Sequence, residues 1–137
     1  MLTEALDRMP HRGRMRLIDT ILSADKRSIV CRATDHRPDD YPLRIDGVLI
    51  PAMLIEIGAQ AAAAHTSIHG IGAAHTGLVV ALSNVEIRRD TVSDDAPLDA
   101  RAEVRQVIGD SARYRFEVSD AEGLLVTGEV LLQMWRH

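Results

Sequence analysis

Residues 50–65 read IPAMLIEIGAQAAAAH, and this stretch restricts the fold more than any other part of the chain. Pro51 suits a first helical turn, where its missing N–H costs no hydrogen bond. Strong helix formers follow, with five alanines within residues 59–64, and a glycine-containing segment (69–77) ends the pattern. The sequence therefore predicts a helix from Pro51 to about Ile68. Because this helix is apolar on nearly all sides, it must be buried.

Segments typical of β-strands lie on both sides of the predicted helix. They are rich in β-branched residues or alternate between apolar and polar residues, and turns rich in Asp, Gly and Ser separate them. The predicted strands are 15–25, 28–34, 78–89, 98–109, 112–120 and 124–135. A short helix is also predicted over 3–8, with Thr3 as its cap, and a loop rich in Asp and Pro over 35–47.

The order of these elements is two strands, one long buried helix and four strands. One helix cannot cover its own surface, but a sheet that curls around it can. The small alanine side chains would let the strands approach the helix axis closely. The sequence therefore predicts one α+β domain over residues 1–137, with the hot-dog fold. In this fold a long central helix is wrapped by a curved, mainly antiparallel sheet of about five to six strands.

Composition excludes several functional classes. A net charge of −4 and only four aromatic residues argue against nucleic-acid binding. The longest apolar run (48–64) is short for a membrane span and contains Glu56 and Gln60, so we expect no membrane association. The first residues lack the layout of a secretion signal, which favours a cytoplasmic protein. Cys31 is the only cysteine, so the chain forms no internal disulfide.

Glu56 is the residue that most strongly indicates chemistry. An ionised carboxyl is costly to bury unless it has a partner or a role. Burial should raise the pKa of Glu56, which would suit proton transfer near neutral pH. Gln60 follows four residues later on the same helix face, so its amide can hydrogen-bond and orient the Glu56 carboxyl. A structural carboxylate capped by Gln60 or by backbone amides is the alternative.

Three segments resemble the hot-dog 3-hydroxyacyl-[acyl-carrier-protein] dehydratases of fatty-acid synthesis, and above all their relatives in aryl polyene and similar acyl-chain pathways. MPHRGRMRLIDTI (9–21) matches the family's opening Pro-His-Arg, apolar pair and Asp. IPAMLIEIGAQAAAA (50–64) matches the family helix with its Glu and following Ala-Gln. SDAEGLLVTGEVLLQM (119–134) matches the closing hairpin. Together they cover nearly the whole chain.

The resemblance implies a reaction and a site. Dehydration of a 3-hydroxyacyl thioester needs a base for the C2 proton and an acid for the leaving hydroxyl. Glu56 would be the acid or a shared acid and base, with Gln60 orienting it. Amides at the helix start, near Asp46, Gly47, Ala52 and Met53, would polarise the thioester oxygen. The resemblance implies no cofactor and no metal.

Partners also follow from the resemblance. The substrate would be a thioester carried by acyl carrier protein. Hot-dog protomers of this family pair side by side, so we expect a homodimer or a heterodimer with a related hot-dog subunit. Arginines at positions 12, 14, 16, 88 and 89 would form a basic patch for the acidic carrier, although ordinary solvated strand faces explain them equally well.

One catalytic residue of the family has no counterpart at the same place. The family carries a His in a His-Phe-Pro-Gly stretch ahead of the helix, whereas residues 41–51 read YPLRIDGVLIP. His36 lies upstream and is the second catalytic candidate, although we expect an exposed loop histidine there unless the loop folds back. Asp46 falls near the family motif, where a simple turn residue before Gly47 is the alternative.

The remaining signals favour structural roles. His65, His69 and His75 superficially suggest a metal site, but no acidic or cysteine partner accompanies them. Residues 10–12 (PHR) fit packing near a sheet edge better than chemistry. Gly58 in mid-helix indicates either a close contact with a strand or acyl chain, or simple tolerance.

Two other functions fit the same pattern. A hot-dog thioesterase would use Glu56 to activate water or to attack the thioester carbonyl, and it would not need the missing histidine. A non-catalytic subunit would keep the acyl pocket and serve as the partner of a catalytic homologue.

Overall fold

A computed structural model describes residues 16–38, 40–69, 76–94 and 97–135. Within these residues the chain forms one long helix and six strands, in the order that the sequence predicts. The strands are β1 (Thr20–Ala24), β2 (Ser28–Ala33), β3 (Thr76–Ile87), β4 (Leu98–Ile108), β5 (Ser111–Asp120) and β6 (Gly123–Trp135). The helix α2 (Ile55–His69) follows a 3-10 turn (Pro51–Leu54).

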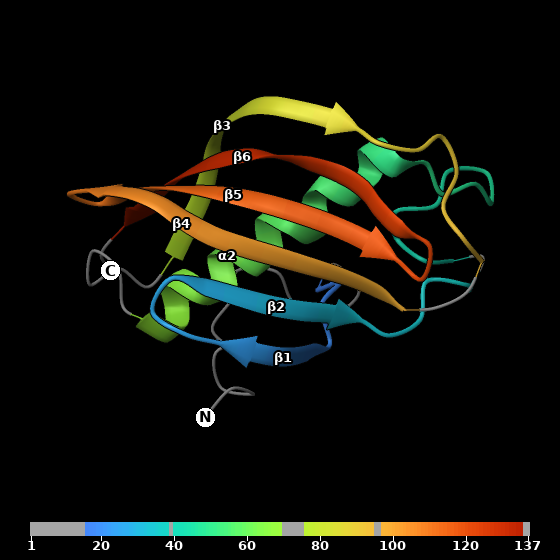
Figure 1. The fold of residues 1–137 in the computed structure, drawn as a ribbon, viewed down its shortest axis with the longest axis horizontal. Helices are drawn as coiled ribbons and strands as arrows, with labels where there is room; N and C mark the ends of the chain where they lie inside the picture. The colour runs from blue at the N-terminus through green and yellow to red at the C-terminus, as the bar shows by residue number, and fades with distance from the viewer. Residues whose placement is uncertain (1–15, 39, 70–75, 95–96, 136–137) are drawn as a thin grey trace.

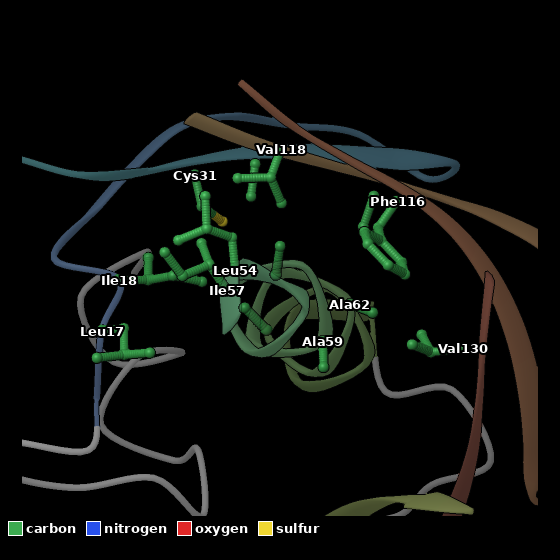
Figure 2. Close-up of a cluster of buried hydrophobic side chains, with 14 of the residues drawn as sticks. Leu17, Ile18, Cys31, Leu54, Ile57, Ala59, Ala62, Phe116, Val118 and Val130 are labelled. Atoms are coloured by element: carbon green, nitrogen blue, oxygen red, sulfur yellow. The ribbon is translucent and has the colours of Figure 1, made fainter. Parts of the chain in front are cut away.

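The six strands form one sheet in the order β1-β2-β4-β5-β6-β3, and every neighbouring pair is antiparallel. Figure 1 shows α2 running behind this curved sheet, with β3 and β1 at its two edges. Figure 2 looks along the helix and shows the strands arching over it. This arrangement is the hot-dog fold, as predicted.

The helix is as buried as its composition predicts. Pro51 is the first residue of the 3-10 turn, and every residue from Ile57 to Thr66 is buried. Alanine side chains make up half of this buried segment, so strands can lie close to the helix on several sides. The helix packs against the strands β2 to β6. No helix among the described residues is long and apolar enough to span a membrane.

Gly58 lies at a close contact between helix and sheet. Its backbone faces the ring of Phe116 on β5, and a Cβ at residue 58 would lie only 2.7 Å from Phe116 Cγ. The glycine therefore marks a close approach between helix and strand. Figure 2 shows Phe116 beside the helix, opposite Ala62, in the cluster of buried apolar side chains.

The first strand is shorter than predicted. The sequence predicts a strand over 15–25, but β1 covers only Thr20–Ala24 and contains a bulge between Ile21 and Ser23. Leu17 and Ile18 are apolar because they are buried in the core near α2, not because they belong to the strand. The predicted helix over 3–8 lies outside the described residues.

The loop between β2 and the helix contains one tight turn. Ile45 and Val48 form an isolated antiparallel bridge, with hydrogen bonds of 2.8 and 2.9 Å between their backbones. Asp46 and Gly47 occupy the turn with φ values of 52° and 77°, a conformation that favours Asp, Asn and Gly. Asp46 is therefore a turn residue with an exposed side chain, and its expected role in substrate binding stays a prediction.

Candidate functional site

Glu56 lies in the first turn of α2 and is half-buried. Gln60 Nε2 donates a hydrogen bond to Glu56 Oε1 at 3.3 Å. The other end of the Gln60 amide is also used, because Gln60 Oε1 accepts a 2.9 Å hydrogen bond from the Leu17 N–H. Gln60 itself has no exposed surface. A backbone amide thus fixes the Gln60 side chain, and Gln60 in turn orients the Glu56 carboxyl.

The amides at the helix start are less available than the sequence suggests. The Met53 N–H donates to Ile50 O at 3.1 Å. The Ile55 N–H is directed at the carbonyl oxygens of Ala52 and Met53. The 3-10 turn therefore uses the Met53 and Ile55 amides internally. Ala52 is exposed and Met53 is half-buried. The expected role of these two residues in substrate binding stays a prediction.

His36 is not an exposed loop residue, so that expectation is wrong. Its side chain is only 1% exposed. The loop folds back because Arg44 holds it: Arg44 Nε donates to His36 O at 3.0 Å, and Arg44 Nη1 donates to Gly47 O at 3.0 Å. Within the described part of the chain, neither ring nitrogen of His36 has a hydrogen-bond partner. A buried polar atom left without a partner costs about 1–3 kcal/mol.

His36 is one of the residues that line a cavity of about 270 Å³, although its ring nitrogens are themselves buried. Residues 47–50, the loop after β3 (90–92), Arg44 and Asp94 form the rest of the wall. Gly47 therefore shares a cavity with His36, as their neighbouring positions in the loop suggest. Asp46, Glu56 and Gln60 do not line it. Glu56 is thus hydrogen-bonded to Gln60, and His36 and Gly47 line the same cavity. Glu56 and Gln60 do not line that cavity.

Tyr41 is a residue that the sequence analysis overlooked. Its ring packs edge-on toward His36, with 6.4 Å between ring centroids. Burial, with a smaller contribution from the nearby Asp19 charge, raises the pKa of Tyr41 to about 12. Its hydroxyl is also buried without a partner among the described residues. The sequence signal that could have identified Tyr41 is its position between Pro38 and Pro42 in a chain with only four aromatic residues.

His65 of the helix serves the fold. His65 is buried, and its ring contacts Tyr114 Oη through Nδ1 at 2.6 Å and Asp25 O through Nε2 at 2.9 Å. Both nitrogens are therefore used, and burial lowers the pKa of His65. The described residues contain no group of three side chains suited to hold a metal ion. His75 lies outside them.

The arginines after β3 are largely neutralised by neighbouring carboxylates. Arg88 pairs with Glu86 at 3.0 Å, and Arg89 pairs with Glu122 at 2.8 Å and with Asp120. Burial tends to raise the pKa of Asp120, but hydrogen bonds from the Ser93 and Glu122 amides and from Arg89 lower it overall. Arg89 therefore connects the end of β3 to the β5–β6 hairpin, whereas Arg88 pairs within its own strand segment. Arg12, Arg14 and the PHR segment lie outside the described residues.

The edge strand β3 is unusually exposed. It pairs only with β6 in the sheet, and every residue from 81 to 87 is exposed, on both faces of the strand. Leu82 is 49% exposed, Ile87 46% and Val85 38%. β3 therefore presents apolar side chains on an exposed edge of the sheet, a combination that can favour pairing with another chain.

Residues 3–133 match the family model described as ApeP-like, ApeP dehydratase. No curated protein matches the chain. Among solved structures, the chain is similar to the dehydratase heterocomplex ApeI:P from Xenorhabdus doucetiae, with 20% identity and a TM-score of 0.80, over 96% of this chain and 91% of that one.

Two further structures share the fold at lower similarity. One is the E. coli PaaI protein from the phenylacetic acid degradation operon, with 18% identity and a TM-score of 0.65, over 96% of this chain and 86% of that one. The other is a hypothetical thioesterase with coenzyme A from Streptococcus pneumoniae TIGR4, with 12% identity, a TM-score of 0.67 and 86% of both chains. Identities this low establish the fold alone, whereas the family model covers almost the entire sequence. The chain therefore belongs to the ApeP-like family of dehydratases.

Proposed function

We propose that this protein dehydrates 3-hydroxyacyl thioesters carried by acyl carrier protein, in fatty-acid or polyene-type chain synthesis, with Glu56 as the catalytic residue. The observation that carries this proposal is the oriented carboxyl: Glu56 at the start of a buried helix, held at 3.3 Å by Gln60. A single carboxyl in a fixed orientation suits a reaction that moves one proton over a short path.

The proposed reaction uses Glu56 twice. As a carboxylate it removes the proton from C2, and the electron pair of that C–H bond moves toward the thioester carbonyl. The protonated Glu56 then gives the proton to the C3 hydroxyl, the C3–O bond breaks, and water leaves as the C2–C3 double bond forms. The carboxylate is regenerated, so no other reactant is consumed. Gln60 keeps the carboxyl in one orientation through both steps, because Leu17 fixes the Gln60 amide.

A dehydration assay tests this proposal directly. Purified protein would receive a 3-hydroxyacyl carrier thioester, and loss of water would be followed by mass spectrometry of the acyl chain. We expect Glu56→Gln to lower turnover by at least about 10²-fold, the usual contribution of a positioned acid–base group. Glu103→Gln, on β4 and paired with Arg101 and Arg105, is the matched control. Turnover unaffected by Glu56→Gln would remove Glu56 from the mechanism.

The same assay separates the alternatives. Release of free thiol from a saturated acyl thioester would favour a thioesterase that uses Glu56 against the carbonyl. No reaction of either thioester, combined with tight binding to a catalytic homologue, would favour a non-catalytic subunit. The solved structure named as the ApeI:P heterocomplex makes the second outcome worth testing with a partner present.

We also propose that the protein pairs with a second hot-dog subunit, identical or related, along β3. The exposed apolar edge of residues 81–87 supports this pairing. A strand added there would extend the sheet beyond β3 and cover these side chains.

A further inference from the structure

The imidazole of His65 connects the C-terminal half of α2 to two other parts of the fold. Its side chain has no exposed surface, its Nδ1 lies 2.6 Å from Tyr114 Oη, and its Nε2 lies 2.9 Å from Asp25 O. A carbonyl oxygen can only accept a hydrogen bond, so the neutral ring carries its proton on Nε2 and donates it to Asp25 O. Nδ1 is then an acceptor, and the Tyr114 hydroxyl donates to it. The neutral ring therefore uses both of its nitrogens.

The Asp25 carbonyl belongs to the turn of residues 25–28, which joins β1 to β2 beside the C-terminal end of α2 (Figure 1). Residues 25–27 are exposed, so this turn separates His65 Nε2 from solvent. A second hydrogen bond links the turn to the sheet, because the Val104 N–H on β4 donates to Arg27 O at 2.8 Å. The turn is thus held over His65 by the helix on one side and by β4 on the other.

A second proton on the ring conflicts with this arrangement. When Nδ1 is also protonated, both ring nitrogens donate, and Tyr114 Oη must accept instead of donate. The hydroxyl hydrogen of Tyr114 then needs a new acceptor, although the Tyr114 side chain has no exposed surface. The charged ring also loses its hydration, because the turn keeps water from it. The closed turn therefore fits a neutral His65 and not an imidazolium.

The charges around His65 do not compensate for its burial. The charged and titratable residues of the elements around the ring are His69 on α2, Asp25, Lys26 and Arg27 on the turn, Tyr114 on β5 and Cys31 on β2. The Asp25 carboxylate favours a charged His65, whereas His69, whose ring centroid lies 4.5 Å away, disfavours it. The charged side chains described on β3 to β6 lie outside the hydrophobic core. Burial therefore decides the outcome and lowers the pKa of His65.

We propose that the turn of residues 25–28 is a lid that opens when His65 takes up a proton from solvent. In the open form the imidazolium is hydrated, and the hydrogen bond from the Val104 N–H to Arg27 O is broken. The turn moves rather than the helix, because the turn is exposed whereas residues 57–66 of α2 are buried. The pairing of β2 with β4 beyond Ser28 stays intact, so the opening is local. The proposal does not rest on the dehydratase function, because it involves neither Glu56 nor Gln60.

Amide hydrogen exchange of the full chain tests the lid, with Val104 as the reporter because its N–H is bonded to Arg27 O. The protection factor is the intrinsic exchange rate divided by the observed rate, so it corrects for the pH dependence of exchange itself. We expect the protection factor of Val104 to fall by up to about 30-fold from pH 7.5 to pH 5. This is the limit for one histidine that regains its usual pKa of about 6.5 when the turn opens.

Low, non-denaturing urea separates local from global opening. A local opening exposes little surface, so the exchange rate of Val104 at pH 5 should not depend on urea in this range. A protection factor of Val104 that does not change with pH would overturn the proposal. Exchange of Val104 that accelerates with urea as global unfolding does would also overturn it, because the turn would then open only with the whole protein.

Substitutions of the two histidines assign the proton. His65→Gln keeps a donor and an acceptor but cannot titrate, so the pH dependence of Val104 protection should disappear. His69→Gln, at the exposed end of α2, is the control and should keep it. A pH dependence that survives in His65→Gln would refute the assignment. If His65→Gln does not fold, ¹⁵N NMR of the His65 ring in the unmodified chain decides the matter. The ring should stay neutral, with its proton on Nε2, while Val104 is protected, and a charged ring beneath a closed turn would overturn the proposal.

Discussion

The ring of Phe116 lies between two glycines of different elements, Gly58 on α2 and Gly128 on β6. A Cβ at residue 58 would be 2.7 Å from Phe116 Cγ, and a Cβ at residue 128 would be 2.9 Å from Phe116 Cζ. The ring therefore occupies space that a side chain at either position would need. This arrangement sets the distance between helix and sheet at the turn of α2 that also carries Glu56.

We expect Gly58→Ala to destabilise the protein. An added methyl in a filled core costs about 1–3 kcal/mol, and Phe116 must shift because the methyl contacts its Cβ and Cγ rather than its flexible end. The higher helix propensity of alanine offsets at most about 1 kcal/mol of this loss in the free energy of unfolding. Urea unfolding should therefore show a net loss of up to about 2 kcal/mol. In a Phe116→Leu background the same change should cost less, and an equal cost in both backgrounds would contradict this explanation.

Much of the fold could be predicted from local sequence patterns. The helix over 51–68 was predictable because its composition allows only burial, and the five strands β2 to β6 were predictable from alternating or β-branched segments between turns. The Glu56–Gln60 hydrogen bond was predictable because residues four apart share a helix face. The catalytic roles assigned to these residues stay predictions.

The position of His36 could not be predicted in the same way. Its burial depends on Arg44, which is eight residues away and bonds the His36 carbonyl, and on Tyr41, which packs beside the ring. Contacts of this kind depend on how a loop folds back and leave no periodic signal in the sequence. The N-terminal limit of β1 was missed for a related reason, because Leu17 is apolar to fill the core rather than to form a strand.

Gln60→Leu tests the role of Gln60 in orienting Glu56. If Glu56 performs the dehydration, loss of its hydrogen-bond donor should lower kcat by up to about 10²-fold through misplacement, with a smaller change in KM. A merely structural Gln60 would leave kcat unchanged in the folded fraction. The Leu17 N–H also loses its acceptor, so the free energy of unfolding should fall by about 1–3 kcal/mol. Steady-state kinetics on carrier-bound substrate and urea unfolding measure the two effects separately.

His65 should make stability depend on pH between neutrality and mild acid. Burial lowers the pKa of His65 below its usual value of 6.5, whereas the unfolded chain titrates near that value. Below about pH 6.5 the unfolded state therefore binds more protons, and stability falls as the pH drops. The slope approaches about 1.4 kcal/mol per pH unit for one proton. Unfolding measured between pH 7 and pH 5 should reveal this slope.

The control for this prediction is the neighbouring histidine. His65→Gln should reduce the slope, whereas His69→Gln should leave it close to that of the unmodified chain, because His69 is exposed. The carboxylates with lowered pKa values do not interfere. Asp35 has a pKa of about 2, and the pKa values of Asp19, Asp25 and Asp120 are also lowered, so all four titrate below this window. Identical slopes in the unmodified chain and in His65→Gln would argue against a buried, neutral His65.

Leu82→Lys on β3 should prevent assembly without unfolding the protomer. Leu82 is 49% exposed, so a lysine there disturbs no core packing, but a charge on a strand edge opposes pairing with another chain. We expect size-exclusion chromatography with light scattering to show a shift from dimer to monomer, and co-purification with a related hot-dog subunit to be lost. Ile108→Lys, at the end of the interior strand β4 and 66% exposed, changes the charge equally away from β3 and should leave assembly intact. A Leu82→Lys protein that still assembles would place the interface elsewhere. A shift to monomer in both variants would point to a general effect of added charge rather than to β3.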